Sequence, residues 1–309
     1  MSSIIQFFAA RNIRHTFGSS DKRRDAGQTT PADIMRYDNI LYGNDRRLKK
    51  WQLLDVYRPK NALESDGSLK KLPVIVSVHG GAWVYGDKNR YQFYCMRLAQ
   101  RGFAVINYSY RLAPEAKFPS SMQDTESVFQ WACANADQYG FDTSNFFAVG
   151  DSAGGHLLSL YCDAITNEEY KKNYPFIKDK KMTLRAVALN CGKYTLDDSE
   201  PKFRLLRKGY LPHGGTPEEV QLINSAAHVT KDFPPAFIMT CIGDFLYNQA
   251  DIIKKALDKA GVRNELHCYG SQEKALWHVF HCDPKLPEAV ICNDDECNFF
   301  RSFISSINK

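Results

Sequence analysis

Short apolar runs and longer amphipathic stretches alternate along most of this chain. The run Leu72–Val78 is rich in β-branched residues and nearly free of polar ones, which predicts a strand buried on both faces of a sheet. A stretch with helical periodicity follows at about 88–101 and ends at Gly102. Similar runs predict further strands, and together they cover residues 50–57, 72–78, 103–108, 146–149, 184–189, 236–241 and 265–269.

Helical patterns separate most of these strands, at about 88–101, 121–138, 153–166, 247–260 and 286–307. This alternation predicts an α/β protein with a mostly parallel sheet covered on both faces, in a single domain over residues 1–309. Two segments depart from this alternation of strands and helices. Residues 1–36 look helical at first and then polar and irregular, and residues of about 193–232 form a long insertion with weak periodicity, as is typical of a lid at a functional edge.

Composition narrows the class of protein. The net charge of +5 is small and spread along the chain, which argues against a nucleic-acid partner. The nine cysteines are odd in number and several lie in apolar runs, which favours a reducing compartment. We see no convincing signal peptide and no apolar run near the ~20 residues that span a bilayer. We therefore expect a cytoplasmic protein without stable membrane insertion, and a homo-oligomer stays open.

The segment Gly150-Asp151-Ser152-Ala153-Gly154 has the form G-x-S-x-G and stands between a predicted strand and a predicted helix. That context is the one in which this motif holds a reactive serine on a strained turn. Glycine is needed two residues to either side because larger side chains would collide with the adjacent strand and helix. The alternative is a glycine-rich turn that only connects two elements. We interpret Ser152 as a nucleophile.

A second motif, His79-Gly80-Gly81-Ala82-Trp83, follows the buried strand. Two glycines leave backbone amides accessible to an oxyanion, which acyl-transfer enzymes must stabilise. We therefore predict an oxyanion hole made by the amides of Gly80, Gly81 and Ala153. The similar segment 213–215 follows no buried strand, so we interpret it as a turn in the insertion.

A serine nucleophile needs a base and an orienting acid, which in this kind of fold follow it in the order acid, then histidine. Asp244 comes just after the strand at 236–241, and His278 lies in the loop after the last strand. Asp251 is a weaker alternative for the acid because it should lie inside the following helix. His281 competes with His278, since loops are difficult to place from one sequence.

Aromatic residues flank the proposed site at Trp83, Tyr85 and Trp277, and they either line a substrate pocket or pack in the core. His156 lies inside the helix after the serine, and we interpret it as structural. The histidines and cysteines near the C-terminus fit no standard zinc spacing. We therefore expect neither a metal nor an organic cofactor.

Together with Tyr110–Glu115 of the form Y-R-L-A-P-E, the two glycine motifs resemble those of the hormone-sensitive-lipase-like carboxylesterases, which include bacterial acetyl esterases. The resemblance covers about 70–282. It implies an α/β-hydrolase fold, hydrolysis of carboxylic esters, and a small cap built from the N-terminal segment and the insertion. Ala82 departs from the family, which often has a third glycine there.

The resemblance and the motifs predict hydrolysis of a small, short-acyl ester through an acyl-enzyme at Ser152. Two alternatives stay open. One is an amide- or formamide-cleaving enzyme on the same triad, because the sequence does not reveal the leaving group. The other is a non-catalytic ligand-binding relative, which the presence of all three triad residues disfavours.

Overall fold

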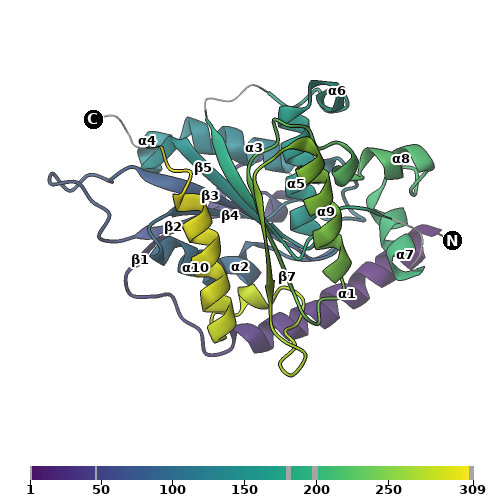
Figure 1. Ribbon diagram of the computed structural model, residues 1–309, viewed down its shortest axis with the longest axis horizontal. Helices are drawn as coiled ribbons and strands as arrows, with labels where there is room; N and C mark the ends of the chain where they lie inside the picture. Colours follow the sequence, from purple (N-terminus) through teal and green to yellow (C-terminus); the bar gives the residue numbers. More distant parts are fainter. Residues whose placement is uncertain (1, 46, 179–181, 197–200, 306–309) are drawn as a thin grey trace.

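The computed structural model describes residues 2–45, 47–178, 182–196 and 201–305. A sheet with the strand order β1-β2-β4-β3-β5-β6-β7-β8 forms its centre (Figure 1). The strands are β1 (Ile34–Leu41), β2 (Leu53–Pro59), β3 (Leu72–Val78), β4 (Ala104–Tyr108), β5 (Phe141–Asp151), β6 (Leu184–Asn190), β7 (Ala236–Cys241) and β8 (Asn264–Tyr269). β2 is antiparallel to both β1 and β4, and all other neighbours are parallel. The predicted mostly parallel sheet is confirmed.

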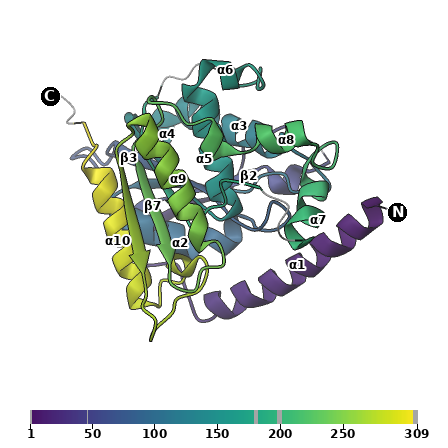
Figure 2. The same cartoon turned by 45° about the vertical axis from the view of Figure 1, so that its right-hand side comes forward.

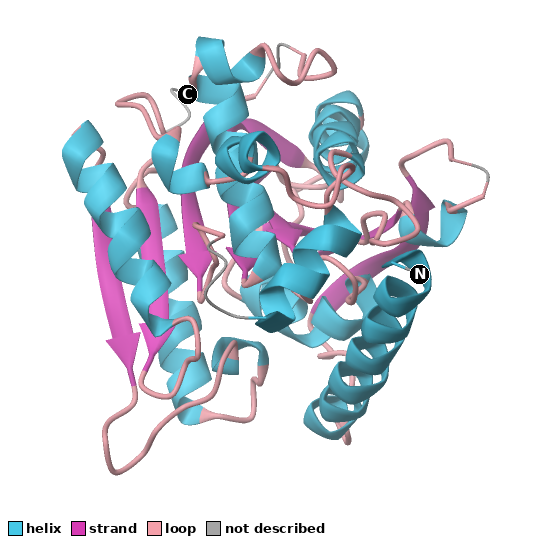
Figure 3. Ribbon diagram, turned by 90° about the vertical axis from the view of Figure 1, so that its right-hand side faces the viewer, coloured by secondary structure: helices cyan, strands magenta, loops and turns pink. Residues whose placement is uncertain are grey.

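Helices cover both faces of this sheet, as Figure 3 shows. Side chains of α2 (Lys88–Gln100) and α10 (Pro287–Arg301) share one core cluster, whereas those of α3 (Ser120–Ala134), α5 (Ala153–Thr166) and α9 (Tyr247–Ala260) share the other. Strand β3 contributes to both clusters. Ile75 packs with α2 and α10, and its neighbours Val74 and Val76 pack in the cluster of α3, α5 and α9. Side chains alternate across a strand, so a strand buried on both faces is apolar throughout.

The remaining helical elements lie outside these two layers or in connections. They are α1 (Ser2–Asp25), α4 (Ala136–Tyr139), α6 (Glu168–Lys171), α7 (Pro201–Tyr210), α8 (Pro217–Leu222) and the 3-10 turns η1 (Lys49–Trp51), η2 (Ser225–Ala227) and η3 (Phe280–Cys282). In the part of the chain that the structure describes, no helix combines the length and the apolar character needed to cross a bilayer.

The N-terminal region differs from the prediction in two ways. α1 continues through Gly18 to Asp25, where the sequence predicted irregular chain, and β1 was not predicted at all. β1 is an edge strand with one buried residue, Ile34, and with Arg36 and Asp38 in its middle. Its pattern therefore lacks the alternation that identifies a half-buried strand.

Figure 2 shows α1 running along one edge of the protein. One arginine of this helix fastens it to the rest of the chain. The guanidinium of Arg14 donates to the backbone oxygens of Val84 and Ala113 at 2.7 and 3.0 Å. It also binds both carboxylate oxygens of Glu115 at 2.6 and 2.7 Å. Further along the helix, the Tyr85 hydroxyl donates to Asp21 at 2.7 Å. α1 is thus tied to the loop that follows β3 and to the Y-R-L-A-P-E segment.

Candidate active site

The predicted strained turn lies between β5 and α5. Ser152 has φ +52° and ψ −118°, a conformation that non-glycine residues rarely adopt. A Cβ atom on Gly150 would lie 2.6 Å from the backbone oxygen of Gly154, and one on Gly154 would lie 2.0 Å from that of Val78. Both contacts are too close for any side chain, so the two glycines allow the turn to form. It presents Ser152 to a cavity at the carboxyl ends of the strands.

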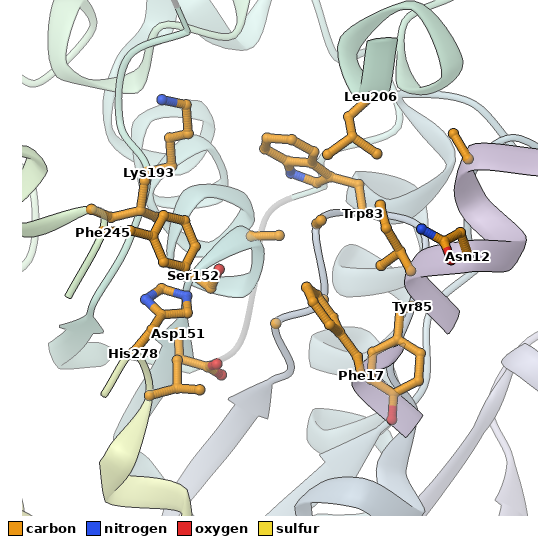
Figure 4. A pocket seen from close by; sticks show the side chains of 18 of the residues that line it. Asn12, Phe17, Trp83, Tyr85, Asp151, Ser152, Lys193, Leu206, Phe245 and His278 are labelled. Carbon is orange, nitrogen blue, oxygen red and sulfur yellow. The ribbon is translucent and has the colours of Figure 1, made fainter. Parts of the chain in front are cut away.

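An aspartate and a histidine meet beside this serine. Asp244 follows β7, and His278 lies in the loop between β8 and η3. Their side chains share a hydrogen bond of 2.7 Å between the His278 Nδ1 and the Asp244 Oδ1. The backbone amide of Leu246 donates to the same oxygen at 2.8 Å. The other nitrogen of the imidazole is left on the cavity side, where Figure 4 shows His278 next to Ser152.

The environment of Asp244 favours its charged form. Burial alone would raise the pKa of this carboxyl, but the hydrogen bond and the charge of His278, helped by the Leu246 amide, lower the pKa below its ordinary value. The Asp244 side chain is fully buried, whereas 17% of the His278 side chain is exposed. Asp244 is therefore a carboxylate that can hold the imidazole in one tautomer and stabilise its protonated form.

The alternative acid and base lie elsewhere. Asp251 is exposed on α9. His281 is buried in η3, where its Nε2 lies 3.5 Å from the Cys282 sulfur. Burial lowers the pKa of His281 to about 3, so it is neutral at pH 7. Asp244 and His278 therefore form a pair beside Ser152, and neither Asp251 nor His281 belongs to it.

The loop after β3 brings amides to the same cavity, in a different set from the predicted one. The Gly80 amide donates to the Tyr91 hydroxyl at 2.9 Å, and that hydroxyl donates to Asp151 at 2.7 Å. The Gly80 amide is therefore already bound and is not available to an oxyanion. Among the described residues, the amides of Gly81 and Ala82 have no hydrogen-bond acceptor. Gly81, Ala82 and Trp83 all have positive φ angles, of 118°, 52° and 62°.

The Ala153 amide is the first of α5, and the first amides of a helix lack partners within it. Helix starts also carry partial positive charge. Asp151 is buried beneath the start of this helix. Burial raises the pKa of Asp151 to about 6, although the hydrogen bond from the Tyr91 hydroxyl and the charge of the nearby His278 oppose the rise. Tyr91 and Asp151 thus hold the first amide of the loop, and the amides of Gly81, Ala82 and Ala153 border the cavity.

The cavity has a volume of about 500 Å³ and a mostly apolar wall. Trp83 and Tyr85 line it, as the sequence analysis allowed, whereas Trp277 is 52% exposed and does not. Most of the other lining side chains come from segments for which we predicted no individual site residue, and they include Asn12, Ile13, Phe17, Lys193, Leu205, Leu206 and Phe245. Figure 4 labels Asn12, Phe17, Lys193, Leu206 and Phe245 among them. Helical spacing of Ala9, Ile13 and Phe17 is the signal that identifies the α1 wall.

Two groups of three side chains in the described residues bring potential metal ligands within 4.8 Å of one another. The first consists of Cys191, Asp244 and His278, of which the last two already share a hydrogen bond. The second is buried and consists of Asp151, His281 and Cys282, and Asp151 already accepts from Tyr91. We assign no metal to either group.

Comparisons with known proteins agree on the class. The BD-FAE family model matches residues 54–257. The versiconal hemiacetal acetate esterase of Dothistroma septosporum is 26% identical over 251 residues, which are 73% of this chain and 71% of that protein. Esterase LipC of Mycobacterium tuberculosis is 33% identical over 210 residues, which are 65% of this chain and 49% of LipC.

A solved structure extends the likeness to almost the whole chain. Esterase B of Lactobacillus rhamnosis, in a structure with a C4-C4 SN3 tributyrin phosphonate, is 25% identical and has a TM-score of 0.87. The match covers 97% of this chain and 96% of that one, which confirms the predicted α/β-hydrolase fold. The chain therefore belongs to the BD-FAE family, among the hormone-sensitive-lipase-like α/β-hydrolases, and is a carboxylic ester hydrolase.

Proposed function

We propose that the protein hydrolyses short-acyl carboxylic esters with Ser152 as nucleophile, His278 as general base and Asp244 as the acid that orients the base. The observation that carries the proposal is the 2.7 Å contact between His278 and Asp244 on the cavity that Ser152 lines. A serine hydroxyl is a weak nucleophile, and a neighbouring imidazole activates it by accepting its proton. The carboxylate then stabilises the imidazolium that forms.

The reaction has two halves. Ser152 attacks the ester carbonyl while His278 takes its proton, and the same imidazole then protonates the leaving alcohol. Water, activated by His278, attacks the acyl-enzyme and releases the acid. In both halves negative charge develops on the carbonyl oxygen, and we assign its stabilisation to the amides of Gly81, Ala82 and Ala153. Ala82 replaces Gly80 in this set because the Gly80 amide already donates to Tyr91.

Size and lining of the cavity support small esters with apolar groups. A volume of about 500 Å³ suits a small molecule, and the wall is mostly aromatic and aliphatic. Helices α1 and α7 supply Ile13, Phe17 and Leu206 to this wall, and we assign them to the cap expected from residues 1–36 and about 193–232. Two relatives are named for acetate esters, the versiconal hemiacetal acetate esterase and the ethyl acetate hydrolase of Pseudomonas putida.

Steady-state hydrolysis of p-nitrophenyl esters from C2 to C12 tests the proposal. We expect the highest kcat/KM at short chains and a loss of about 10⁴-fold or more in the Ser152→Ala variant. A matched amide separates the alternative leaving group, because an esterase should cleave it far more slowly. Retained turnover in purified Ser152→Ala protein would show that another residue performs the chemistry.

A further inference from the structure

Large apolar side chains are exposed at the N-terminal end of α1. Ile5, Phe7 and Phe8 are 53%, 48% and 65% exposed. With Phe17, four of the twelve exposed large apolar side chains in the described residues lie on this one helix of 24 residues. Single exposed apolar residues are normal on a protein surface, but a concentration of them marks an interaction site.

One of these side chains, Ile5, continues the wall of the cavity outward. Ala9, Ile13 and Phe17 line the cavity and are spaced four residues apart, so they lie along one side of α1. Ile5 stands four residues before Ala9 and extends the same stripe beyond the cavity. An apolar track therefore leads from the cavity along α1 to the exposed end of the helix, which reaches past the body of the protein beside α7 (Figure 2).

The same two helices hold most of the excess positive charge. α1 has five Lys and Arg residues against two Asp, and α7 has four against none. Their combined excess is seven positive charges, whereas the whole chain has a net charge of +5. Over the whole cap, residues 1–36 and about 193–232, the sequence has twelve Lys and Arg against nine Asp and Glu, so α1 and α7 are the basic part of a cap with an excess of three positive charges. Arg11 and Lys208 are exposed members of this set.

We propose that the α1 end of the cap docks the enzyme on the surface of an anionic lipid bilayer. Exposed aromatic and aliphatic side chains next to basic ones are the composition of helices that lie in the headgroup region of a membrane. Basic residues near such a surface each strengthen adsorption about fivefold when the lipid is anionic. A second copy of the chain fits this surface less well, because pairing two caps would bring like charges together.

Docking in this orientation has a consequence for substrate entry, which rests on the proposed function. α1 would lie against the headgroups, with the apolar stripe leading from Ile5 to Ile13 inside the cavity. An amphiphilic ester could then pass from the lipid surface to Ser152 along apolar side chains. The preferred substrates at such a surface are short-acyl esters of lipid-soluble alcohols.

Vesicle co-sedimentation of the full chain tests the docking without any catalytic readout. We expect binding to vesicles of phosphatidylcholine and phosphatidylglycerol, and much weaker binding to phosphatidylcholine alone or at high salt. Combined Phe7→Ser and Phe8→Ser substitutions should weaken binding at least tenfold. Val290→Ser and Ile291→Ser form the matched control, because they replace an adjacent pair of 41% and 54% exposed residues on α10.

Charge is tested separately. Arg11→Gln with Lys208→Gln should weaken binding about 25-fold, from about fivefold for each residue, whereas Lys255→Gln on α9 should not weaken it. Hydrolysis of dissolved p-nitrophenyl acetate should be unchanged in the Phe7 and Phe8 variant, which shows that it is folded. Failure of the wild type to bind anionic vesicles, or equal losses in the α1 and α10 variants, overturns the docking proposal. So does a dimer in solution that the Phe7 and Phe8 substitutions dissociate. None of these results depends on Ser152 being the nucleophile.

Discussion

Replacement of His156 by phenylalanine should destabilise the protein and slow catalysis together, although this side chain lies outside the cavity. His156 is fully buried in α5 and bridges two parts of the active-site surroundings. The indole Nε1 of Trp83 donates to its Nδ1 at 3.1 Å, and its Nε2 lies 2.7 Å from the backbone oxygen of Ile223. A carbonyl oxygen only accepts hydrogen bonds, so Nε2 holds the proton and Nδ1 is the acceptor.

Burial lowers the pKa of His156 to about 4, so the neutral form that makes both contacts is present at pH 7. Phenylalanine has a similar size but no polar atom, and it would leave the Trp83 indole and the Ile223 oxygen unpartnered. Each buried unpartnered group costs about 1–3 kcal/mol. The loss in unfolding free energy for the two groups should thus be about 2–6 kcal/mol, and each kcal/mol lowers Tm by roughly 2 °C in a chain of this length.

Catalysis should respond because Trp83 follows Ala82, whose amide we assign to the oxyanion hole. Trp83 is held between His156 and the ring of Tyr210, whose centroid is 5.0 Å away, and it keeps a positive φ. A displaced loop loses part of the ~100-fold effect of one oxyanion donor, so kcat should fall about tenfold or more while KM changes little. His156→Gln, which can both accept and donate, should recover part of both losses.

Thermal unfolding and p-nitrophenyl acetate kinetics of the two variants supply the test. A His156→Phe protein with wild-type Tm and kcat would show that neither hydrogen bond of His156 stabilises the protein or positions the loop. A Gln variant as poor as the Phe variant would also contradict the prediction, because it would show that the shape of the ring matters and the two polar contacts do not.

Three further predictions concern other buried groups. Asp244→Asn should lower kcat about 10⁴-fold with little change in fold, as judged by circular dichroism, because it removes the charge that orients the base; a tenfold loss or less would argue for another acid. Burial raises the pKa of Glu296 to about 7, above its unfolded value, so the wild type loses stability as pH rises toward and beyond 7. Glu296→Gln should therefore gain Tm relative to the wild type at pH 8 and not at pH 5, and an equal difference at both would contradict this. Gly154→Ala should unfold the protein or lower its Tm steeply because of the 2.0 Å backbone contact, whereas Gly18→Ala, whose added carbon would be 3.8 Å from its nearest neighbour, should preserve or raise Tm; similar Tm values for the two variants would count against the steric argument.

Much of this fold was predictable because its parallel strands are buried on both faces. The segments Leu72–Val78 and Ala236–Cys241 are almost entirely apolar and therefore predict strands from local sequence alone. Their predicted bounds agree with the structure. β1 was missed since an edge strand with the charged residues Arg36 and Asp38 in its middle has no such pattern. α1 was predicted too short, because Gly18 and the polar residues after it resemble a helix end.

The candidate site divides in the same way. The strained turn at Ser152 was predictable because local geometry dictates its glycine neighbours, and the positions of Asp244 and His278 because they follow strands in the expected order, whereas the catalytic roles of the three stay predictions. The hydrogen bond between Gly80 and Tyr91 joins the loop after β3 to α2, and the local sequence of neither segment indicates it. The position of Trp277 depends on how its loop turns, and local sequence does not determine that either. The contribution of α1 to the cavity wall could not be predicted, because it depends on the tertiary position of a helix that is far from the other site residues in sequence.

Labelling with a fluorophosphonate followed by peptide mass spectrometry identifies the nucleophile of the enzyme. The reagent reacts with serines that a neighbouring base has activated, and its adduct identifies the residue. We predict one adduct on Ser152, formed rapidly in the wild type and far more slowly in the His278→Ala variant. An adduct on a different residue, or no adduct in an enzyme that hydrolyses p-nitrophenyl acetate, would contradict the account.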